Sequence, residues 1–266
     1  MITLHSLHRY LVKSTRGEML ESAQVTAAGI ALDRRWMVAE QTDQHPNRMI
    51  TGRNDPRLVQ VSVRAVADGL TLHAPDMTDT HVPLADFSTP LEASVWRDTF
   101  AATTGSAVAD AWFSAYLGRP VRLLYTGSDI ARRVRTHPDV PVGFADGYPL
   151  LLIHTASLAD LSARIGRDMM AARFRPNLVV SGGEAFAEDG WRTLRIGDVL
   201  FSVAKPCSRC VFTTVDPQTG DKAADQEPLR TLSGFRRRQD GVMFGLNLVA
   251  EGRGTIECGM PVEIVA

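Results

Sequence analysis

The chain has 266 residues, of which 44% are hydrophobic and 22% are charged, and its formal net charge is −1. This composition is typical of a folded globular protein and excludes a disordered one. A nearly neutral chain has no overall field that favours nucleic acid or an anionic membrane, so we expect neither as a partner. The three cysteines, an odd number, argue against a disulfide framework. Because we find no apolar h-region at the N-terminus and no apolar stretch of about 18 residues, we expect a cytoplasmic location.

Short β-like runs dominate the first hundred residues. Residues 58–66 alternate between apolar and polar side chains, which is the pattern of a half-buried strand. Asp68-Gly69 then predicts a tight turn into Leu70-Thr71-Leu72, so the two runs together predict a β-hairpin. Two further strands are predicted over residues 2–7 and 30–39.

Two helices are predicted in the middle of the chain. The first begins after Ser106, a typical N-cap residue, and ends at Gly118. The second spans residues 157–165. Its first serine and Asp160 have the spacing of a capping box, and Gly166 terminates it.

The rest of the chain is predicted to be rich in strands, and the fold class is therefore mainly β with helical decoration (α+β). A boundary between two β-rich units is expected between residues 90 and 125. The polar and basic stretch 127–148 is expected to be a loop or a sheet edge. Strands are predicted over residues 121–125, 177–181, 193–204, 211–215, 244–250 and 261–265.

Cys207-Ser-Arg-Cys210 is the first segment that indicates chemistry. A C-x-x-C motif has three common functional interpretations: half of a zinc site, a redox pair, or a site where one thiolate binds a soft metal. A structural interpretation, two small residues in a strand, fits the same spacing. A zinc site lacks its second pair here, since Cys258 has no nearby histidine. A redox pair lacks its usual βαβ context. Lys205 and Arg209 lie close by, and positive charge favours the thiolate, which is the form that binds metals.

Basic residues recur in a second motif, Arg173-Phe-Arg-Pro-Asn177. We expect Pro176 to hold Arg175 in an extended conformation, in which side chains two residues apart point the same way. Guanidinium groups bind phosphate through paired hydrogen bonds, although an exposed basic edge strand has the same pattern.

Three shorter motifs add possible contacts. Asp146-Gly147 predicts a turn that exposes a carboxylate, whereas Lys13-Ser14 and Arg34 can donate to an anion. Singly, each also suits a plain turn or a charged surface. Together the motifs outline a site in which a thiolate and a carboxylate lie beside one anionic ligand. Its cradle would consist of Lys13, Ser14, Arg34, Arg175, Ser208 and Arg209.

These segments, in this order, resemble the MOSC-domain family over essentially the whole chain. The resemblance is nearest to the bacterial YcbX-type proteins and to the mitochondrial amidoxime reducing component. It implies an N-terminal MOSC-associated β-rich domain over residues 1–120, a MOSC β-barrel over residues 121–266, and a cofactor site between them. The matching segments include LVKS (11–14), LDRRWMV (32–38), FADGYP (144–149), RFRPNLVVSG (173–182), EDGW (188–191), IGD (196–198), KPCSRCVFTTVDPQTG (205–220), EPLRTL (227–232) and FGLNLVA (244–250).

The resemblance implies a pyranopterin molybdenum cofactor. In that family the second cysteine of the CSRC segment, here Cys210, ligates molybdenum. The aspartate of the FAD segment, here Asp146, approaches the metal-bound water. Cys207 is not the expected ligand. The remaining cofactor contacts implied by the family are Lys13, Ser14, Arg34, Gly147, Tyr148, Arg175, Ser208, Arg209 and Asn247.

The chemistry implied by the resemblance is the reduction of an N–OH group to N–H and water, with two electrons and two protons. The substrate class is N-hydroxylated compounds such as amidoximes. Some YcbX-type proteins carry a ferredoxin domain, but this sequence has no C-x4-C-x2-C run and hence no expected iron–sulfur cluster. We therefore expect either an external electron-donor protein of the ferredoxin or flavin type, or a longer protein of which this sequence is a part.

Three other interpretations remain open at this point. A sulfur-carrier role would use a persulfide on Cys207 or Cys210, as MOSC domains do at the end of cofactor sulfurases. The sequence lacks the aminotransferase-like domain of those proteins. A protein that only binds and delivers the molybdenum cofactor, or a β-barrel with a structural zinc, would also fit the motifs.

Overall fold

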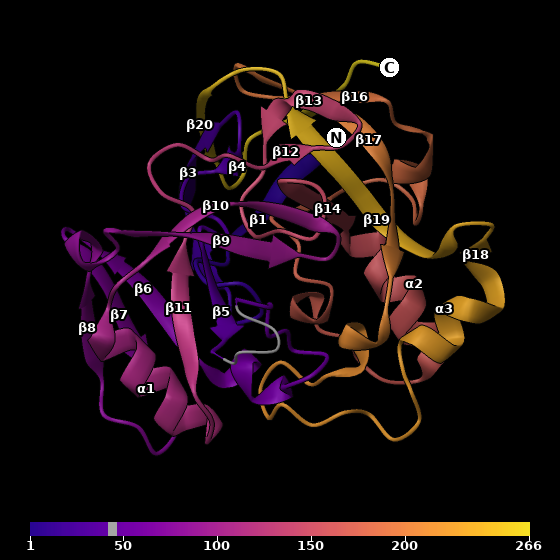
Figure 1. Ribbon diagram of the computed structural model, residues 1–266. Helices are drawn as coiled ribbons and strands as arrows, with labels where there is room; N and C mark the ends of the chain where they lie inside the picture. The colour runs from indigo at the N-terminus through magenta and orange to yellow at the C-terminus, as the bar shows by residue number, and fades with distance from the viewer. Residues whose placement is uncertain (42–46) are drawn as a thin grey trace.

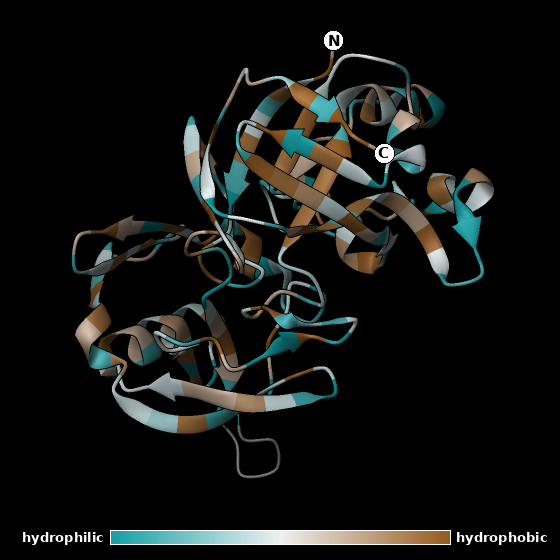
Figure 2. Cartoon of the chain, turned by 90° about the horizontal axis from the view of Figure 1, so that it is seen from above, coloured by the Kyte–Doolittle hydropathy of each residue, from teal (hydrophilic) through white to brown (hydrophobic). Residues whose placement is uncertain are grey.

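The computed structural model describes residues 1–41 and 47–266, and strands account for most of its regular structure (Figure 1). The predicted class, mainly β with helical decoration, is confirmed. In Figure 2 the chain gathers into two lobes, and hydrophobic residues follow the strands of the lobe that contains both termini. Among the described residues, no helix is both long enough and apolar enough to span a bilayer.

The largest sheet curls back on itself into a barrel. The strand at residues 262–264 returns to the strand at residues 3–9, because Leu4 N donates to Met260 O over 2.9 Å and Val262 N donates to Ile2 O over 2.9 Å. Closure leaves few unpaired backbone groups at the sheet edges. The strand order is β2 (Glu18–Leu20), β1 (Thr3–Arg9), β15 (Leu178–Ser181), β14 (Leu150–His154), β19 (Gly241–Ala250), β17 (Val199–Arg209), β16 (Thr193–Ile196) and β21 (Val262–Ile264), and β18 (Arg237–Arg238) also pairs with β19.

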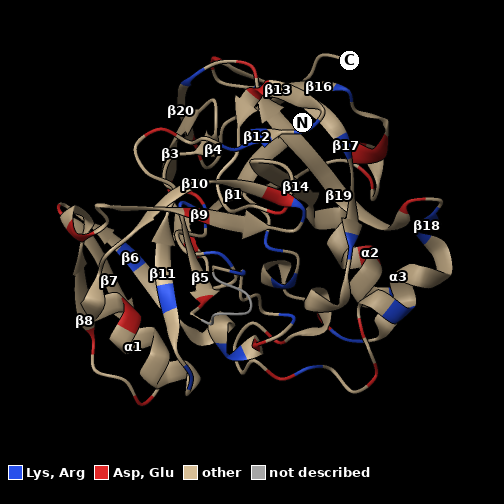
Figure 3. Cartoon of the chain, viewed as in Figure 1, with Lys and Arg blue, Asp and Glu red and all other residues tan. Residues whose placement is uncertain are grey.

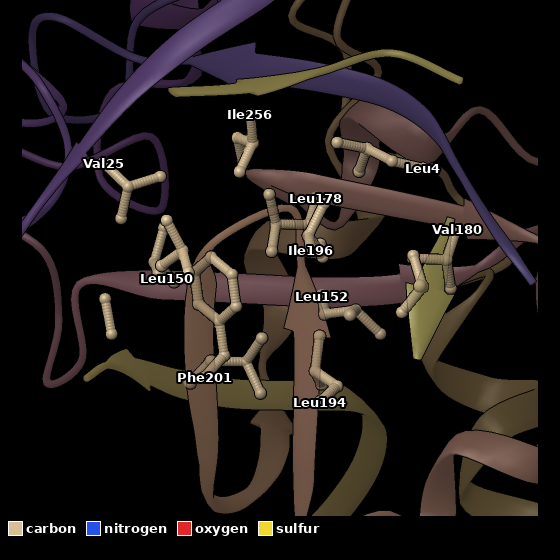
Figure 4. Close-up of a cluster of buried hydrophobic side chains, with 14 of the residues drawn as sticks. Leu4, Val25, Leu150, Leu152, Leu178, Val180, Leu194, Ile196, Phe201 and Ile256 are labelled. Carbon is tan, nitrogen blue, oxygen red and sulfur yellow. The ribbon is translucent and has the colours of Figure 1, made fainter. Parts of the chain in front are cut away.

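The barrel interior is filled mainly by branched aliphatic side chains, which point toward one another and toward Phe201 in Figure 4. Leu152 on β14 and Phe201 on β17 are both fully buried there. Alternate residues on β14 face outward, where Ile153 packs with α2 (Thr155–Ile165) and α3 (Leu229–Phe235). The two helices therefore cover one outer face of the barrel, as the right side of Figure 1 shows.

The other lobe packs two antiparallel sheets and one helix around a second core, which contains Trp112 and Phe113 of α1 (Ala107–Leu117). Its four-stranded sheet is β5 (Trp36–Glu40), β11 (Val121–Tyr125), β10 (Asp98–Thr104) and β9 (Thr89–Val95), and its three-stranded sheet is β6 (Ser62–Val66), β7 (Gly69–His73) and β8 (Thr80–Pro83). Two small sheets complete the described fold: β20 (Gly254–Glu257) with β3 (Ser22–Thr26) and β4 (Gly29–Ile30), and β12 (Arg133–Val134) with β13 (His137–Pro141).

Strands pair across the predicted boundary at residue 120 in both directions. β1, from the start of the chain, pairs with β15 of the barrel, whereas β11, just after the boundary, pairs with β5. The chain therefore passes from one lobe to the other more than once. The division into 1–120 and 121–266 stays a prediction.

The helix signals were confirmed in part. Ser106 caps α1 and Gly118 ends it in the left-handed conformation, as predicted. Gly166 likewise ends α2, but this helix begins at Thr155, and its cap is His154, whose Nδ1 accepts from Ala156 N over 3.0 Å. Ser157 is therefore not the cap. Its hydroxyl instead donates to the buried Glu188 carboxylate over 2.7 Å.

Four predicted strands were wrong in part, each for a local reason. Residues 193–204 form two antiparallel strands, β16 and β17, joined by a turn at residues 197–198. Residues 30–39 are broken by a turn with left-handed residues at Leu32 and Arg34. Residues 58–66 begin as a 3-10 helix with Pro56 in its first turn. Residues 211–214 also form a 3-10 helix, because the hydroxyls of Thr213 and Thr214 donate to carbonyls three residues earlier.

The barrel core predicts a large cost for truncating Phe201. We expect Phe201→Ala to lower the free energy of unfolding by about 3–5 kcal/mol, because the cavity left behind cannot collapse fully. Urea denaturation measures this change. The control is Val66→Ala, on a strand residue that is 43% exposed, for which we expect a change of about 0.5 kcal/mol or less. Similar costs for both variants would contradict the assigned core.

Candidate functional site

All eleven residues that the sequence predicted for the site line one cavity of about 330 Å³. The cavity has the size of a small-molecule site. Its walls carry seven cationic side chains and one carboxylate, and Lys and Arg segments lie among the central loops of Figure 3. The predicted residues are Cys210, Asp146, Lys13, Ser14, Arg34, Gly147, Tyr148, Arg175, Ser208, Arg209 and Asn247, and the other cations are Arg53, Arg173 and Lys205.

Three of the predicted residues have a left-handed backbone. Ser14 has a φ of 71°, Arg34 of 49° and Arg175 of 56°. Residues other than glycine rarely adopt this conformation, and such strained positions gather where a fold must hold side chains for function. The sequence predicted that Arg175 would be extended, which was wrong. Pro176 disfavours a right-handed helical conformation for Arg175, and the structure turns the backbone to the left-handed region instead.

Arg34 and Arg175 both lie over the ring of Tyr10, at 4.6 Å and 4.1 Å from its centroid. Arg34 also donates to Arg175 O over 3.1 Å, so the two residues are fixed relative to each other. Burial lowers the pKa of Arg175, and the nearby charge of Arg34 adds to this effect, so that the pKa falls to about 10. Burial also raises the pKa of Tyr10 to about 12. This corner of the cavity therefore holds two like charges and no ionised tyrosine.

Asp146 is held by three donors. Lys13 Nζ lies 2.5 Å from its Oδ1, Arg53 Nη2 lies 3.1 Å from its Oδ2, and Trp96 Nε1 lies 3.2 Å from its Oδ1. Burial within the site acts to raise the pKa of Asp146, but the charge and hydrogen bond of Lys13, together with Arg53, hold it well below its usual range. Burial lowers the pKa of Lys13, and Asp146 opposes that shift. The carboxylate is ionised at neutral pH, yet its side chain is 55% exposed.

The Cys210 thiol lies at the end of β17, before the 3-10 helix that begins at residue 211. Arg53 Nε lies 3.1 Å from its sulfur, so one guanidinium bridges Cys210 and Asp146. Arg209 donates to the sulfur of Cys207 over 2.9 Å and to Phe174 O over 2.7 Å. The sulfur of each cysteine in the motif therefore accepts a hydrogen bond from a different arginine.

Ser208 and Asn247 reach the cavity because the pairing of β17 with β19 is irregular. The register shifts between Val203 and Lys205 and again between Pro206 and Ser208. Gly245, on the facing strand, has a φ of 77°, and a Cβ there would lie 2.5 Å from Leu152 O. Bulges of this kind redirect side chains next to functional sites.

Arg132 fixes the loop that carries Asp146. Its guanidinium is buried and donates to the carbonyls of Gly143, Ala145 and Asp146, and it pairs with Asp98 over 2.9 Å. The sequence placed Arg132 in a polar loop or edge, and it had no signal for this internal role. The loop also contacts the turn at Arg34, whose O accepts from Phe144 N over 2.7 Å.

The sequence missed Arg53, Trp96 and Tyr10 as site residues. Arg53 follows Gly52, where a Cβ would lie 2.2 Å from the Phe212 ring. In the sequence, the one pattern that could have indicated Arg53 as a site residue is a glycine beside an arginine in a polar loop, and this pattern is weak.

Arg173 lines the cavity but is engaged elsewhere, since its Nη2 pairs with Asp216 over 2.6 Å.

The walls fit an anionic cofactor with a soft metal. Arg175 Nη2 and Arg209 Nε are buried and have no hydrogen-bond partner among the described residues. A buried donor without a partner costs about 1–3 kcal/mol, and an anion in the cavity would remove that cost. A thiol, which binds soft metals, lies in the same cavity. Conversely, no group of three or more His, Cys, Asp and Glu side chains in the described ranges is placed to hold a metal ion.

The Asp98 pair predicts a pH-dependent loss of stability. Burial acts to raise the pKa of Asp98, but the hydrogen bond and charge of Arg132, with Arg135, hold it below the usual 3.8. Its stabilisation is therefore present above pH 3.8 and is lost as the pH falls through the lower folded pKa. We expect Asp98→Asn to lower the unfolding free energy by about 1–3 kcal/mol at pH 7, because Arg132 is left unpaired.

The difference between wild type and Asp98→Asn should shrink as the pH falls below 3.8, which urea unfolding at several pH values measures. Asp139→Asn, on an exposed strand residue, is the control and should change little at any pH. A difference that is constant with pH would contradict the assigned pairing.

The buried Arg175 Nη2 and Arg209 Nε, which lack a partner among the described residues, predict that inorganic phosphate stabilises the protein purified without cofactor. At tenfold the dissociation constant, phosphate should add about 1.4 kcal/mol of stability, seen as a rise in melting temperature. We expect Arg209→Gln to remove most of this rise. Arg195→Gln, on an exposed strand outside the cavity, is the matched control. Equal rises in both variants would place phosphate binding elsewhere.

Comparisons with known proteins identify the family of this chain. Residues 1–120 match the MOSC N-terminal beta barrel domain, and residues 139–263 match the MOSC domain. Mitochondrial amidoxime-reducing component 1 of Homo sapiens is 35% identical over 99% of this chain and 83% of its own length. The Danio rerio component 1 is 33% identical over 94% and 81%, and the Bos taurus component 2 is 32% identical over 98% and 82%. The chain therefore belongs to the MOSC-domain family that includes the mitochondrial amidoxime-reducing components.

Proposed function

We propose that this chain is a molybdenum-cofactor-dependent reductase of N-hydroxylated compounds. It converts R–NH–OH, two electrons and two protons into R–NH2 and water, with electrons from an external redox protein. The observation that carries the proposal is the joining of Cys210 and Asp146 by Arg53 in a cavity with an excess of cations. The names of the relatives, amidoxime-reducing components, support the substrate class.

The cationic walls bind the cofactor's anionic groups in this proposal. Arg175 and Arg209 each supply a buried donor that has no partner in residues 1–41 and 47–266, and Lys13, Ser14 and Arg34 surround the same space. The Cys210 sulfur is the metal ligand. When bound, the cofactor supplies the two-electron chemistry and a Lewis-acid metal.

Lys13 supplies a proton in this proposal, and Asp146 positions it. The lowered pKa of Lys13 makes its ammonium a better acid than a lysine in water, and its Nζ lies 2.5 Å from Asp146 Oδ1. Lys13, which lines the cavity, gives that proton to the cavity, whereas Asp146 stays ionised and holds the ammonium in place through the ion pair. Arg53 and Trp96 keep the carboxylate in place during the transfer.

The deciding experiment measures molybdenum and pterin in protein made by cells that synthesise the cofactor. We expect near-stoichiometric molybdenum in wild type and its loss in Cys210→Ala, because the thiolate is the protein's bond to the metal. Cys258→Ala is the matched control, since Cys258 lies outside the cavity and packs against the barrel core. It should retain molybdenum.

Reduction of benzamidoxime by the loaded protein with an artificial electron donor then tests the activity. Molybdenum that is bound without any turnover would favour a role in storing or delivering the cofactor. Zinc in place of molybdenum, or molybdenum that survives Cys210→Ala, would contradict the proposal. A persulfide on Cys207 or Cys210, found by mass spectrometry, would favour the sulfur-carrier role.

A further inference from the structure

A second cavity, of about 390 Å³, adjoins the first. The two share four wall residues, Asp146, Gly147, Tyr148 and Lys205, so a ligand that fills one extends naturally into the other. Cys210 lies in the first cavity only. The second cavity is therefore placed to hold the part of a substrate that does not react.

Trp96 is a fixed and exposed aromatic surface in this second cavity. The Arg53 guanidinium lies 4.3 Å from its ring centroid, and its Nε1 donates to Asp146, so the ring cannot turn freely. Its backbone has a φ of 57°, which is strained for tryptophan. Even so, the residue is 49% exposed. A rigid aromatic ring that stays open to solvent is a typical surface on which a flat ligand stacks.

The charge of the second cavity is positive and only partly neutralised. Asp98 is engaged by Arg132 and Arg135, and Asp146 is engaged by Lys13 and Arg53. Three further cations line the wall without a carboxylate partner among residues 1–41 and 47–266. These are Arg97, Arg133, which donates only to backbone carbonyls, and Lys205, which lies 5.7 Å from the Tyr148 ring centroid.

We propose that this second cavity is a substrate subsite for aromatic N-hydroxylated compounds that carry an anionic group, such as a carboxylate or a phosphate. The inference rests on the proposed reductase function and names the substrate class for the same site. The aromatic ring stacks on Trp96, the anionic group pairs with Arg97, Arg133 and Lys205, and the N–OH group points toward Cys210.

The same charges favour release of the product. Reduction of a neutral amidoxime gives a basic amidine, which takes up a proton at neutral pH. The net negative charge of the anionic substrate therefore falls by one, to zero for a substrate with a single carboxylate, and the cationic wall holds the product less strongly. The subsite therefore binds the substrate in preference to the product.

The test is a binding measurement without turnover. Cofactor-loaded protein is kept without an electron donor, and quenching of tryptophan fluorescence reports binding of 4-carboxybenzamidoxime or of neutral benzamidoxime. Trp96 is the exposed tryptophan, whereas Trp36, Trp112 and Trp191 are 2–6% exposed. We expect the anionic probe to bind about tenfold more tightly in low salt, and this preference to weaken as salt is added.

The double variant Arg97→Gln/Arg133→Gln should bring the ratio of the two dissociation constants close to one. Arg195→Gln/Arg253→Gln removes the same charge from two exposed positions outside both cavities, and it should keep the preference. Equal affinities in wild type, or a preference that survives the first double variant, would overturn the subsite. Anion-selective quenching by a protein that never reduces either probe would support the subsite while the proposed reductase function fails.

Discussion

Positive charge gathered around one cavity is the constraint on which the site depends. Like charges repel strongly where water is scarce, and Arg34 and Arg175 are nonetheless held over the same tyrosine ring. Asp33 and Asp146 neutralise part of this charge, through Arg34 and Lys13. In the proposed function an anionic ligand matches the remainder, so binding of that ligand also stabilises this part of the protein.

The barrel positions that charge by bringing distant segments together. β1 ends next to β15, so Lys13 and Ser14 lie near the loop that carries Arg175. The pairing of β17 with β19 carries Cys210 to the same place, and two register shifts in that pair turn Ser208 and Asn247 into the cavity. The second lobe contributes through Arg53 and Trp96, which close over Asp146. Neither lobe alone contains the site.

Much of this arrangement could be predicted from the sequence. Alternating patterns and capping residues located most strands and both ends of α1, and the eleven site residues predicted from the motifs all line the cavity. The predictions that were wrong share a physical cause, because contacts between residues distant in sequence or local side-chain hydrogen bonds determined the backbone conformation there. Ser157 is drawn to Glu188, and the threonine hydroxyls after Cys210 favour a 3-10 helix over a strand. Arg53 belongs to no recognisable pattern, because its role comes from a contact with Cys210, 157 residues away in sequence.

Anomalous diffraction at the molybdenum edge, from crystals of the cofactor-loaded protein, tests the central claim most directly. We expect one strong peak bonded to the Cys210 sulfur and facing Asp146, with electron density for a phosphate against Arg175 and Arg209. A peak away from Cys210, or a cofactor phosphate bound far from these two arginines, would contradict it.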